Sequence, residues 1–244
     1  MTATDERTGT GRRRVPWIVE IYRTDVGKKY AMAITGLIGL AFIVAHMVGN
    51  LHAFQGEVQL DEYGEALRDL GEPILPRTLV LWAFLRVPLI VALGVHVHSA
   101  WALSRSNQHA RGVARYDADR TYLAANYASR TMRWSGIIVL LFLGWHLADL
   151  TWGVEAVNPD FARGAVYANL VASLERWPVA LLYLVAQAAL ALHIWHGGWS
   201  LFQSLGVNNA RFNQFRRTFA TALTIVVIAG FVAVPVAVQV GLIS

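Results

Sequence analysis

The sequence predicts an all-α fold, a polytopic membrane bundle of five transmembrane helices with its N-terminus in the cytoplasm. Of the 244 residues, 55% are hydrophobic and only 15% are charged, which is too apolar for a typical soluble domain. The charges are clustered, so that five stretches long enough to cross the roughly 30 Å hydrocarbon layer are almost free of them. We therefore divide the chain into a cytoplasmic N-terminal segment, residues 1–29, and a five-helix transmembrane domain, residues 30–244.

The N-terminal segment is polar and basic. Residues Met1 to Tyr30 hold seven Lys and Arg against four Asp and Glu. The run Arg12-Arg13-Arg14 is not followed by the apolar core of a signal peptide, so we expect no cleavable signal. Pro16 to Lys29 is predicted to lie along the membrane surface as a short amphipathic helix.

The five spans are predicted from the long apolar runs that follow. The fifth contains no ionisable residue, which indicates a packing or lipid-facing role. In order, the spans are Tyr30 to Ala53, Thr78 to Ser104, Trp134 to Trp152, Pro178 to Leu205 and Thr218 to Ile243.

The loops between the spans alternate in charge. Residues 54–77 carry six acids against two arginines, and residues 153–177 are mildly acidic. By contrast, residues 105–133 carry six arginines against two aspartates, and residues 206–217 carry three arginines and no acid. The positive-inside rule places the basic segments in the cytoplasm. The net charge of +5 is thereby explained by topology, and nucleic acid is excluded as a partner.

Histidines occur inside four successive spans, where an ionisable side chain is costly and marks a functional site. His46 lies in the first span, His96 and His98 in the second, His146 in the third, and His193 and His196 in the fourth. The chain has no cysteine, which excludes c-type haem attachment and thiolate ligation of iron–sulfur clusters by this chain.

The depths of these histidines form two levels. At 1.5 Å per residue, His46 and His146 lie about 24 and 19 Å from the inner ends of their helices, in the outer half. His96 lies about 13 Å and His193 about 15–18 Å from the inner ends of theirs. Two imidazoles at one depth, from different helices, are what a six-coordinate b-type haem requires, so we predict two haem b groups with these four histidines as axial ligands.

Two choices stay open at this point. His96 and His98 are about 200° apart around their helix, so at most one faces a given haem. His193 and His196 are about 60° apart, so His196 is a candidate for contact with the edge or a propionate of the same haem.

Four further ionisable residues are candidates for the site. Arg86 is a candidate partner of a haem propionate, or snorkels to the outer interface. Asp149, one turn outward from His146, is a candidate proton acceptor at an outer quinone site, or a cap at the end of its span. Arg130 and Arg133 are candidates for holding inner propionates or a partner protein, with cytoplasmic anchoring as the alternative.

Several segments carry a resemblance to a known family. They are FIVAHMVGN from Phe42, SGIIVLLFLGWH from Ser135 and ALHIWHGGWSLF from Ala191, with RVPLIVALGVHVHSAWAL around His96 as a weaker match. The chain, from about Lys28 onward, resembles the two-haem, five-helix, single-chain cytochrome b membrane-anchor subunit of the succinate dehydrogenase and fumarate reductase family. By the family pattern the ligand lies six residues before Trp199-Ser200, which selects His193, and spacing favours His96 over His98.

The resemblance implies that His46 and His146 bind the distal haem and His96 and His193 the proximal haem, in a bacterial cytoplasmic membrane. It also implies a flavoprotein and an iron–sulfur subunit on the cytoplasmic face, with or without a further small membrane subunit. Electrons from succinate would pass through the haems to a quinone, with menaquinone as the expected type. Some fumarate-reducing relatives carry a glutamate where this chain has Ala191, which favours succinate oxidation here.

Two other functions are compatible with these sequence features. One is a di-haem cytochrome b anchor of another membrane dehydrogenase, which the copurified subunits would reveal. The other is a haem-free, histidine-lined transporter or metal carrier, which the lack of a b-type absorbance band would favour. The acidic residues lie mostly outside the spans, which leaves few ligands for a hard cation along a path.

Overall fold

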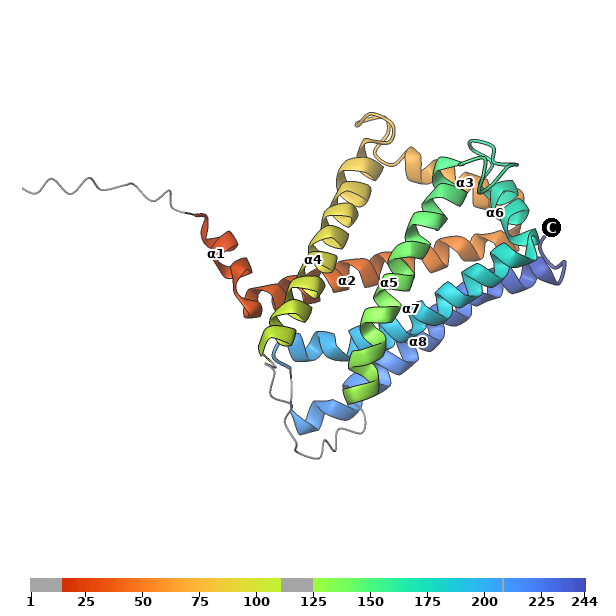
Figure 1. Cartoon of the computed structure of the whole chain (residues 1–244). Coiled ribbons are helices and arrows are strands. Elements are labelled where there is room, and N and C mark those ends of the chain that lie inside the picture. Colours follow the sequence, from red (N-terminus) through yellow and green to blue (C-terminus); the bar gives the residue numbers. More distant parts are fainter. Residues whose placement is uncertain (1–14, 111–124, 208) are drawn as a thin grey trace, which may run out of the picture.

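A computed structural model shows a bundle of long helices (Figure 1). The structure describes residues 15–110, 125–207 and 209–244, and for residues 110 and 125–130 it describes the backbone alone. No strand occurs in these ranges. The prediction of an all-α, five-span membrane protein is confirmed, because the part of the chain that the structure describes contains five helical segments long and apolar enough to cross a bilayer. They are Asp25–Gln55, Leu81–His109, Thr131–Trp152, Trp177–Ser204 and Ala210–Gln239.

The first span begins earlier than the sequence predicted. Helix α1 (Trp17–Arg23) ends before Thr24, whose backbone is extended. The Thr24 hydroxyl oxygen accepts a hydrogen bond of 2.9 Å from the Gly27 amide, so it caps α2 (Asp25–Asn50) in the usual way of a threonine at a helix start. The predicted single surface helix over Pro16 to Lys29 is therefore two pieces, and the second piece is the start of the span.

Each remaining span is one long helix, in two cases with a π-helical section. The 3₁₀ turn η1 (Leu51–Gln55) follows α2. The π-helical section η2 (Leu81–Arg86) opens the second span, which continues as α4 (Val87–Ala110). Helix α5 (Ala125–Leu147) passes into the π-helical section η3 (Ala148–Trp152). Helices α7 (Trp177–Ser204) and α8 (Ala210–Gln239) complete the bundle.

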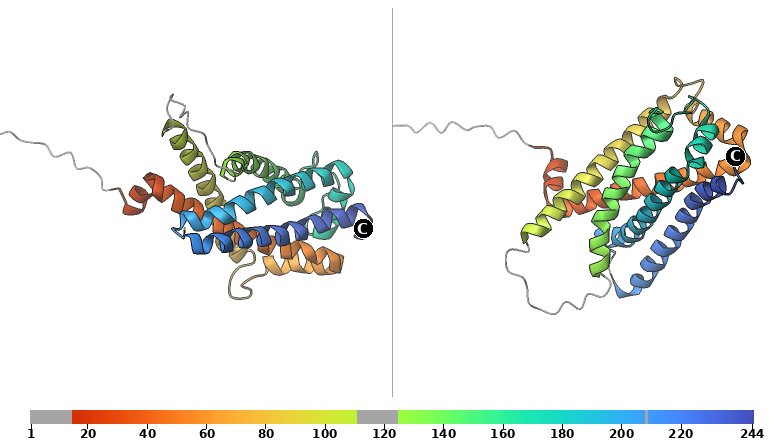
Figure 2. Two further views of the ribbon diagram at one scale, coloured as in Figure 1. Left: turned by 90° about the horizontal axis from the view of Figure 1, so that it is seen from below. Right: turned by 45° about the vertical axis from the view of Figure 1, so that its right-hand side comes forward.

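Two segments predicted as loops contain short helices. Helix α3 (Glu57–Arg68) and helix α6 (Val166–Glu175) lie together at the end of the bundle that holds the C-terminus (Figure 2). The Asp61 carboxylate accepts a hydrogen bond of 2.9 Å from the Tyr167 amide, which joins the two helices. The buried apolar cluster also lies here, with Leu60 of α3, Leu174 of α6 and Val234 of α8 among its members.

The long helices pack as pairs around α2 and α7. Helix α4 packs mainly on α2, α5 packs mainly on α7, and α8 packs along α7 and also contacts α2. Gly230 of α8 approaches α2 closely, since a Cβ at that position would lie 2.4 Å from Sδ of Met47. The fifth span thus packs on α7 and α2 with one side, while Ile225 and Val226 on the same helix are exposed. The four histidine-bearing helices therefore form a row, in which α4 packs on α2, α2 contacts α7, and α7 packs on α5.

Candidate functional site

The outer histidines meet across two helices. The ring centroids of His46 on α2 and His146 on α5 are 5.8 Å apart, with the ring planes at 80°. Phe42 stacks on His46 at 5.3 Å and Phe142 lies 5.8 Å from His146, so each imidazole is backed by an aromatic ring one turn earlier on its own helix. The structure therefore brings together the two residues that depth assigned to the outer level.

The inner histidines meet in the same manner. The ring centroids of His96 on α4 and His193 on α7 are 6.3 Å apart, with the planes at 62°. Two glycines leave room for these rings: a Cβ at Gly36 would lie 3.3 Å from Cε1 of His96, and a Cβ at Gly136 would lie 3.4 Å from Cε1 of His193. Since Gly36 precedes His46 by ten residues on α2, the inner and outer pairs are separated by roughly 15 Å along that helix.

The hydrogen bonds of His96 define which of its ring nitrogens carries the proton. Its Nδ1 lies 3.2 Å from the Met32 carbonyl oxygen, which can only accept. It also lies 3.3 Å from Oγ1 of Thr35, whose own proton is donated to the Ala31 carbonyl at 2.7 Å. Nδ1 must therefore be the donor, and Nε2 of His96 is left with a free lone pair.

The same argument holds at two further histidines. Nδ1 of His193 lies 3.4 Å from Oγ of Ser135, which donates to the Met132 carbonyl at 3.0 Å. Nδ1 of His146 lies 3.3 Å from the Tyr183 hydroxyl, which donates to a carboxylate oxygen of Asp149 at 2.7 Å. Each hydroxyl has given its proton elsewhere, so in both cases the imidazole Nδ1 is the donor.

These features fit a metal between the two rings of each pair. A ligating histidine usually donates its other N–H to a carbonyl or another acceptor, which fixes the ring and its tautomer. Two imidazoles on opposite sides of one metal ion have ring centroids about 6 Å apart, because each metal–nitrogen bond is about 2 Å and the ring centre lies roughly 1 Å further. Both pairs have this spacing. Among the described residues no group of three or more His, Asp or Glu lies close enough together to hold a metal ion.

The two remaining span histidines are engaged elsewhere. Nδ1 of His98 lies 2.6 Å from the Tyr22 hydroxyl of α1, and its ring lines an apolar hollow of about 490 Å³ on the α4 face. His196 is buried, and its Nε2 lies 3.2 Å from Oγ1 of Thr131. The ring pairing across helices therefore involves His96 and His193.

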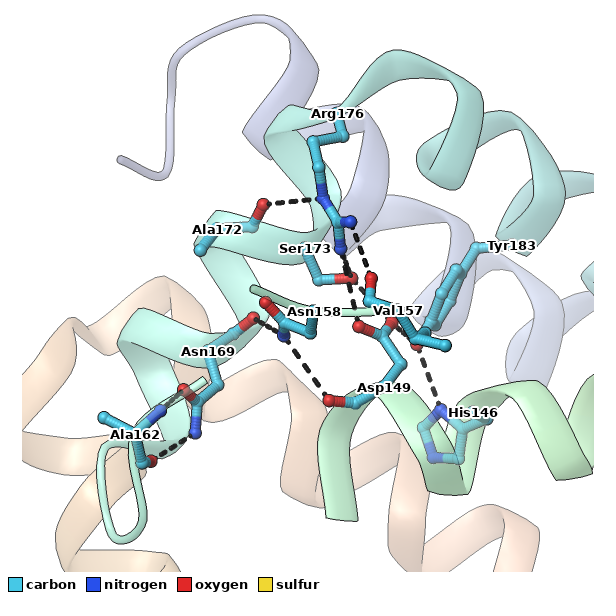
Figure 3. Close-up of polar contacts among 10 residues, drawn as sticks. All are labelled: His146, Asp149, Val157, Asn158, Ala162, Asn169, Ala172, Ser173, Arg176 and Tyr183. Atoms are coloured by element: carbon cyan, nitrogen blue, oxygen red, sulfur yellow. Dashed lines mark hydrogen bonds and ion pairs between the residues drawn. The ribbon is translucent and has the colours of Figure 1, made fainter. Parts of the chain in front are cut away.

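Asp149 lies at the centre of a buried polar cluster beyond the outer pair (Figure 3). Its fully buried carboxylate accepts hydrogen bonds from Ser173 at 2.6 Å and Tyr183 at 2.7 Å, and it faces the Arg176 guanidinium at 3.6 Å. Arg176 also donates to the Val157 carbonyl at 2.6 Å. The local cause is η3: its π-helical turn, closed by Gly153 in the left-handed conformation, turns the carboxylate toward α6 and α7. Asp149 is thus a buried cluster member rather than an exposed cap at the end of the span.

Two of the three candidate arginines have described side chains, and neither makes a hydrogen bond or ion pair with the paired histidines. Arg86 in η2 lies over the Trp82 ring at 4.8 Å. Arg133 is exposed near the inner end of the third span. Arg130 lies outside the described side chains. Their predicted roles toward propionates or a partner stay predictions.

Three residues of the site were not singled out from the sequence: Thr35, Ser135 and Tyr183. A signal for two of them exists, because residues 35–46 and 135–146 are an internal repeat. TGLIGLAFIVAH and SGIIVLLFLGWH share glycine, isoleucine, leucine, phenylalanine and histidine at the same places, and both begin with a hydroxyl residue. The repeat places a hydroxyl and a glycine ten to eleven residues before each outer histidine.

The fold and these contacts define a multi-pass helical membrane protein with two cross-helix histidine pairs. Comparisons with protein-family models, with curated proteins and with solved structures found no match to this chain.

Proposed function

We propose that the chain is the di-haem b membrane-anchor subunit of a succinate:quinone oxidoreductase in a bacterial cytoplasmic membrane. The observation that carries the proposal is the presence of two histidine pairs at two levels, each from two different helices, with Nδ1 engaged and Nε2 free in three of the four rings. The resemblance of the segments around these histidines to the family supports the same function.

Each residue of the site has a role in this proposal. His46 and His146 hold the outer haem, and His96 and His193 the inner haem. Thr35, Ser135 and the Met32 carbonyl orient inner rings, while Gly36 and Gly136 keep their backbones clear of those rings. When bound, the haems supply one-electron transfer along the membrane normal, from an iron–sulfur partner to a quinone such as menaquinone. Succinate would be oxidised on a flavoprotein partner, and no succinate site is proposed on this chain.

Open space near the histidine pairs also supports the proposal that a bulky group such as haem binds there. A Cβ at half-buried Gly39 on α2 would meet nothing within 4 Å, although helices normally bring neighbours into contact there. Gly39 lies seven residues before His46 and therefore on nearly the same side of α2.

The test is to purify the chain with its partners from a native membrane and add succinate. We expect copurified flavoprotein and iron–sulfur subunits and a b-type absorbance band that succinate reduces. A b-type band with other dehydrogenase subunits and no response to succinate would favour the anchor of another dehydrogenase. A colourless preparation would favour a haem-free, histidine-lined transporter and would refute the proposal.

A further inference from the structure

The two histidine pairs differ in the group at which the chain of hydrogen bonds from each Nδ1 ends. At the inner pair, the chain of hydrogen bonds from each Nδ1 ends at a neutral backbone carbonyl: Met32 and Ala31 for His96, and Met132 for His193. At the outer pair, the chain from His146 passes through the Tyr183 hydroxyl and ends at the buried carboxylate of Asp149. The outer imidazole is thus the one of these three that is linked to a charged group.

The direction of these hydrogen bonds follows from the groups involved. A carboxylate oxygen accepts, so Tyr183 donates its one proton to Asp149. The Tyr183 oxygen then accepts from Nδ1–H of His146. A hydrogen bond to a charged acceptor is stronger than one to a neutral group, and the tyrosine passes part of that polarisation to the imidazole. The added partial negative charge on the His146 ring would stabilise the oxidised, more positive state of an iron bound at its Nε2.

We propose that Tyr183 and Asp149 are positioning residues for His146. Tyr183 fixes the Nδ1–H tautomer of His146, and Asp149 lowers the reduction potential of the outer haem relative to the same site without the carboxylate. This inference rests on the proposed function for its haem part, whereas the tautomer part concerns the chain alone. Arg176, at 3.6 Å and partly exposed, is the ion-pair partner that holds the carboxylate in the buried cluster and offsets its charge only in part.

A purely structural role is the competing explanation, because the cluster also ties η3 to α6 and α7. Ser173 provides the matched control. Its hydroxyl donates to the same Oδ2 atom of Asp149, at 2.6 Å, but makes no hydrogen bond to His146. Ser173→Ala and Tyr183→Phe therefore each remove one hydroxyl from the same carboxylate, and only the second removes the link to the histidine.

The first measurement uses the full chain without haem in lipid nanodiscs, with ¹⁵N-labelled histidine. We expect the His146 ring nitrogens to show the Nδ1–H tautomer in the wild type and in Ser173→Ala, and a mixture of tautomers in Tyr183→Phe. If the wild type shows the Nε2–H tautomer, or if Tyr183→Phe leaves the tautomer unchanged, the positioning role is wrong whatever the haem content.

The second measurement is a redox titration of the haem-loaded complex. Asp149→Asn keeps an acceptor for Tyr183 and removes the charge. At a given applied potential, we expect the ratio of oxidised to reduced outer haem to fall at least tenfold in this variant. This equals a rise of about 59 mV in its midpoint potential for a one-electron couple. The midpoint potential of the inner haem should stay unchanged in Asp149→Asn. In Ser173→Ala, the midpoint potentials of both haems should stay unchanged.

Equal shifts in Asp149→Asn and Ser173→Ala, or no shift in Asp149→Asn, would overturn the charge effect. Asp149→Asn also keeps the test decisive if Tyr183→Phe fails to fold. A wild-type complex without haem would refute the proposed function and the charge effect together, while the tautomer result would still decide the role of Tyr183.

Discussion

Gly136 offers a graded steric test of the inner pair. A Cβ at this position would lie 3.4 Å from Cε1 and 3.6 Å from Nδ1 of His193, which is ordinary van der Waals contact. Gly136→Ala should therefore be tolerated with both haems in place. Gly136→Val adds two further carbons around that Cβ, and because the valine rotamer is nearly fixed in a helix, the imidazole has to shift away from them.

Such a shift is large for the site. The Nδ1 to Ser135 distance is already 3.4 Å, so the hydrogen bond that orients the ring would be lost. Overpacking of this kind costs about 1–3 kcal/mol of stability. Losing the hydrogen-bond acceptor of a ligating histidine's other ring nitrogen typically costs about 10–100-fold in metal affinity. We expect Gly136→Val to lose the inner haem while the outer one stays.

The assay is the low-temperature reduced-minus-oxidised spectrum of the purified complex, which resolves the two haems, together with the haem-to-protein ratio. Gly144→Val is the control, because it makes the same substitution on α5 at an exposed position about 200° around the helix from His146, where a Cβ meets nothing within 4 Å. It carries the same cost of helix propensity and should keep both haems. A Gly136→Val complex with two haems of unaltered spectrum would refute the placement of His193 as a ligand beside this glycine.

Three other predictions follow from the contacts. His46→Ala or His146→Ala should remove only the outer haem and leave the inner one reducible by succinate; loss of both signals in an assembled complex would count against the pairing. His98→Ala and His196→Ala should each retain two haems per chain, since these rings contact Tyr22 and Thr131 rather than another histidine, and a loss of one haem would show the wrong residue has been paired. Asp149→Ala should destabilise the bundle by about 3 kcal/mol, because the hydroxyls of Ser173 and Tyr183 lose their buried acceptor and Arg176 loses its ion-pair partner. The measurement is the midpoint of a thermal or SDS unfolding titration, and an unchanged midpoint would contradict this.

The spans and the histidine levels were predictable because each depends on a local property of the sequence. A run of apolar residues such as Ile34 to Phe54 has to be a helix in a bilayer, since backbone groups there can be satisfied only internally. Depth then follows from the helical rise alone, which is why His46 and His146, and His96 and His193, were placed at common levels before their contacts were known.

The short helices and the polar cluster could not be predicted in this way. Helix α3 consists largely of polar residues and is held by a contact to Tyr167, a residue more than a hundred positions away in the chain. Asp149 and Tyr183 come together only through the register of α5 against α7 and through the π-helical turn η3, and neither can be read from one segment. Thr35 and Ser135 are intermediate cases, since aligning the two repeat segments would have revealed them.

The central claim is that the four paired histidines hold two haems, and the most direct measurement is the haem-to-chain ratio of the purified complex, by pyridine haemochrome and quantitative amino-acid analysis. The account predicts two protohaems per chain in the wild type and one in each of the single substitutions His46→Ala, His96→Ala, His146→Ala and His193→Ala. A wild-type complex without haem, or single variants that still hold two, would contradict it.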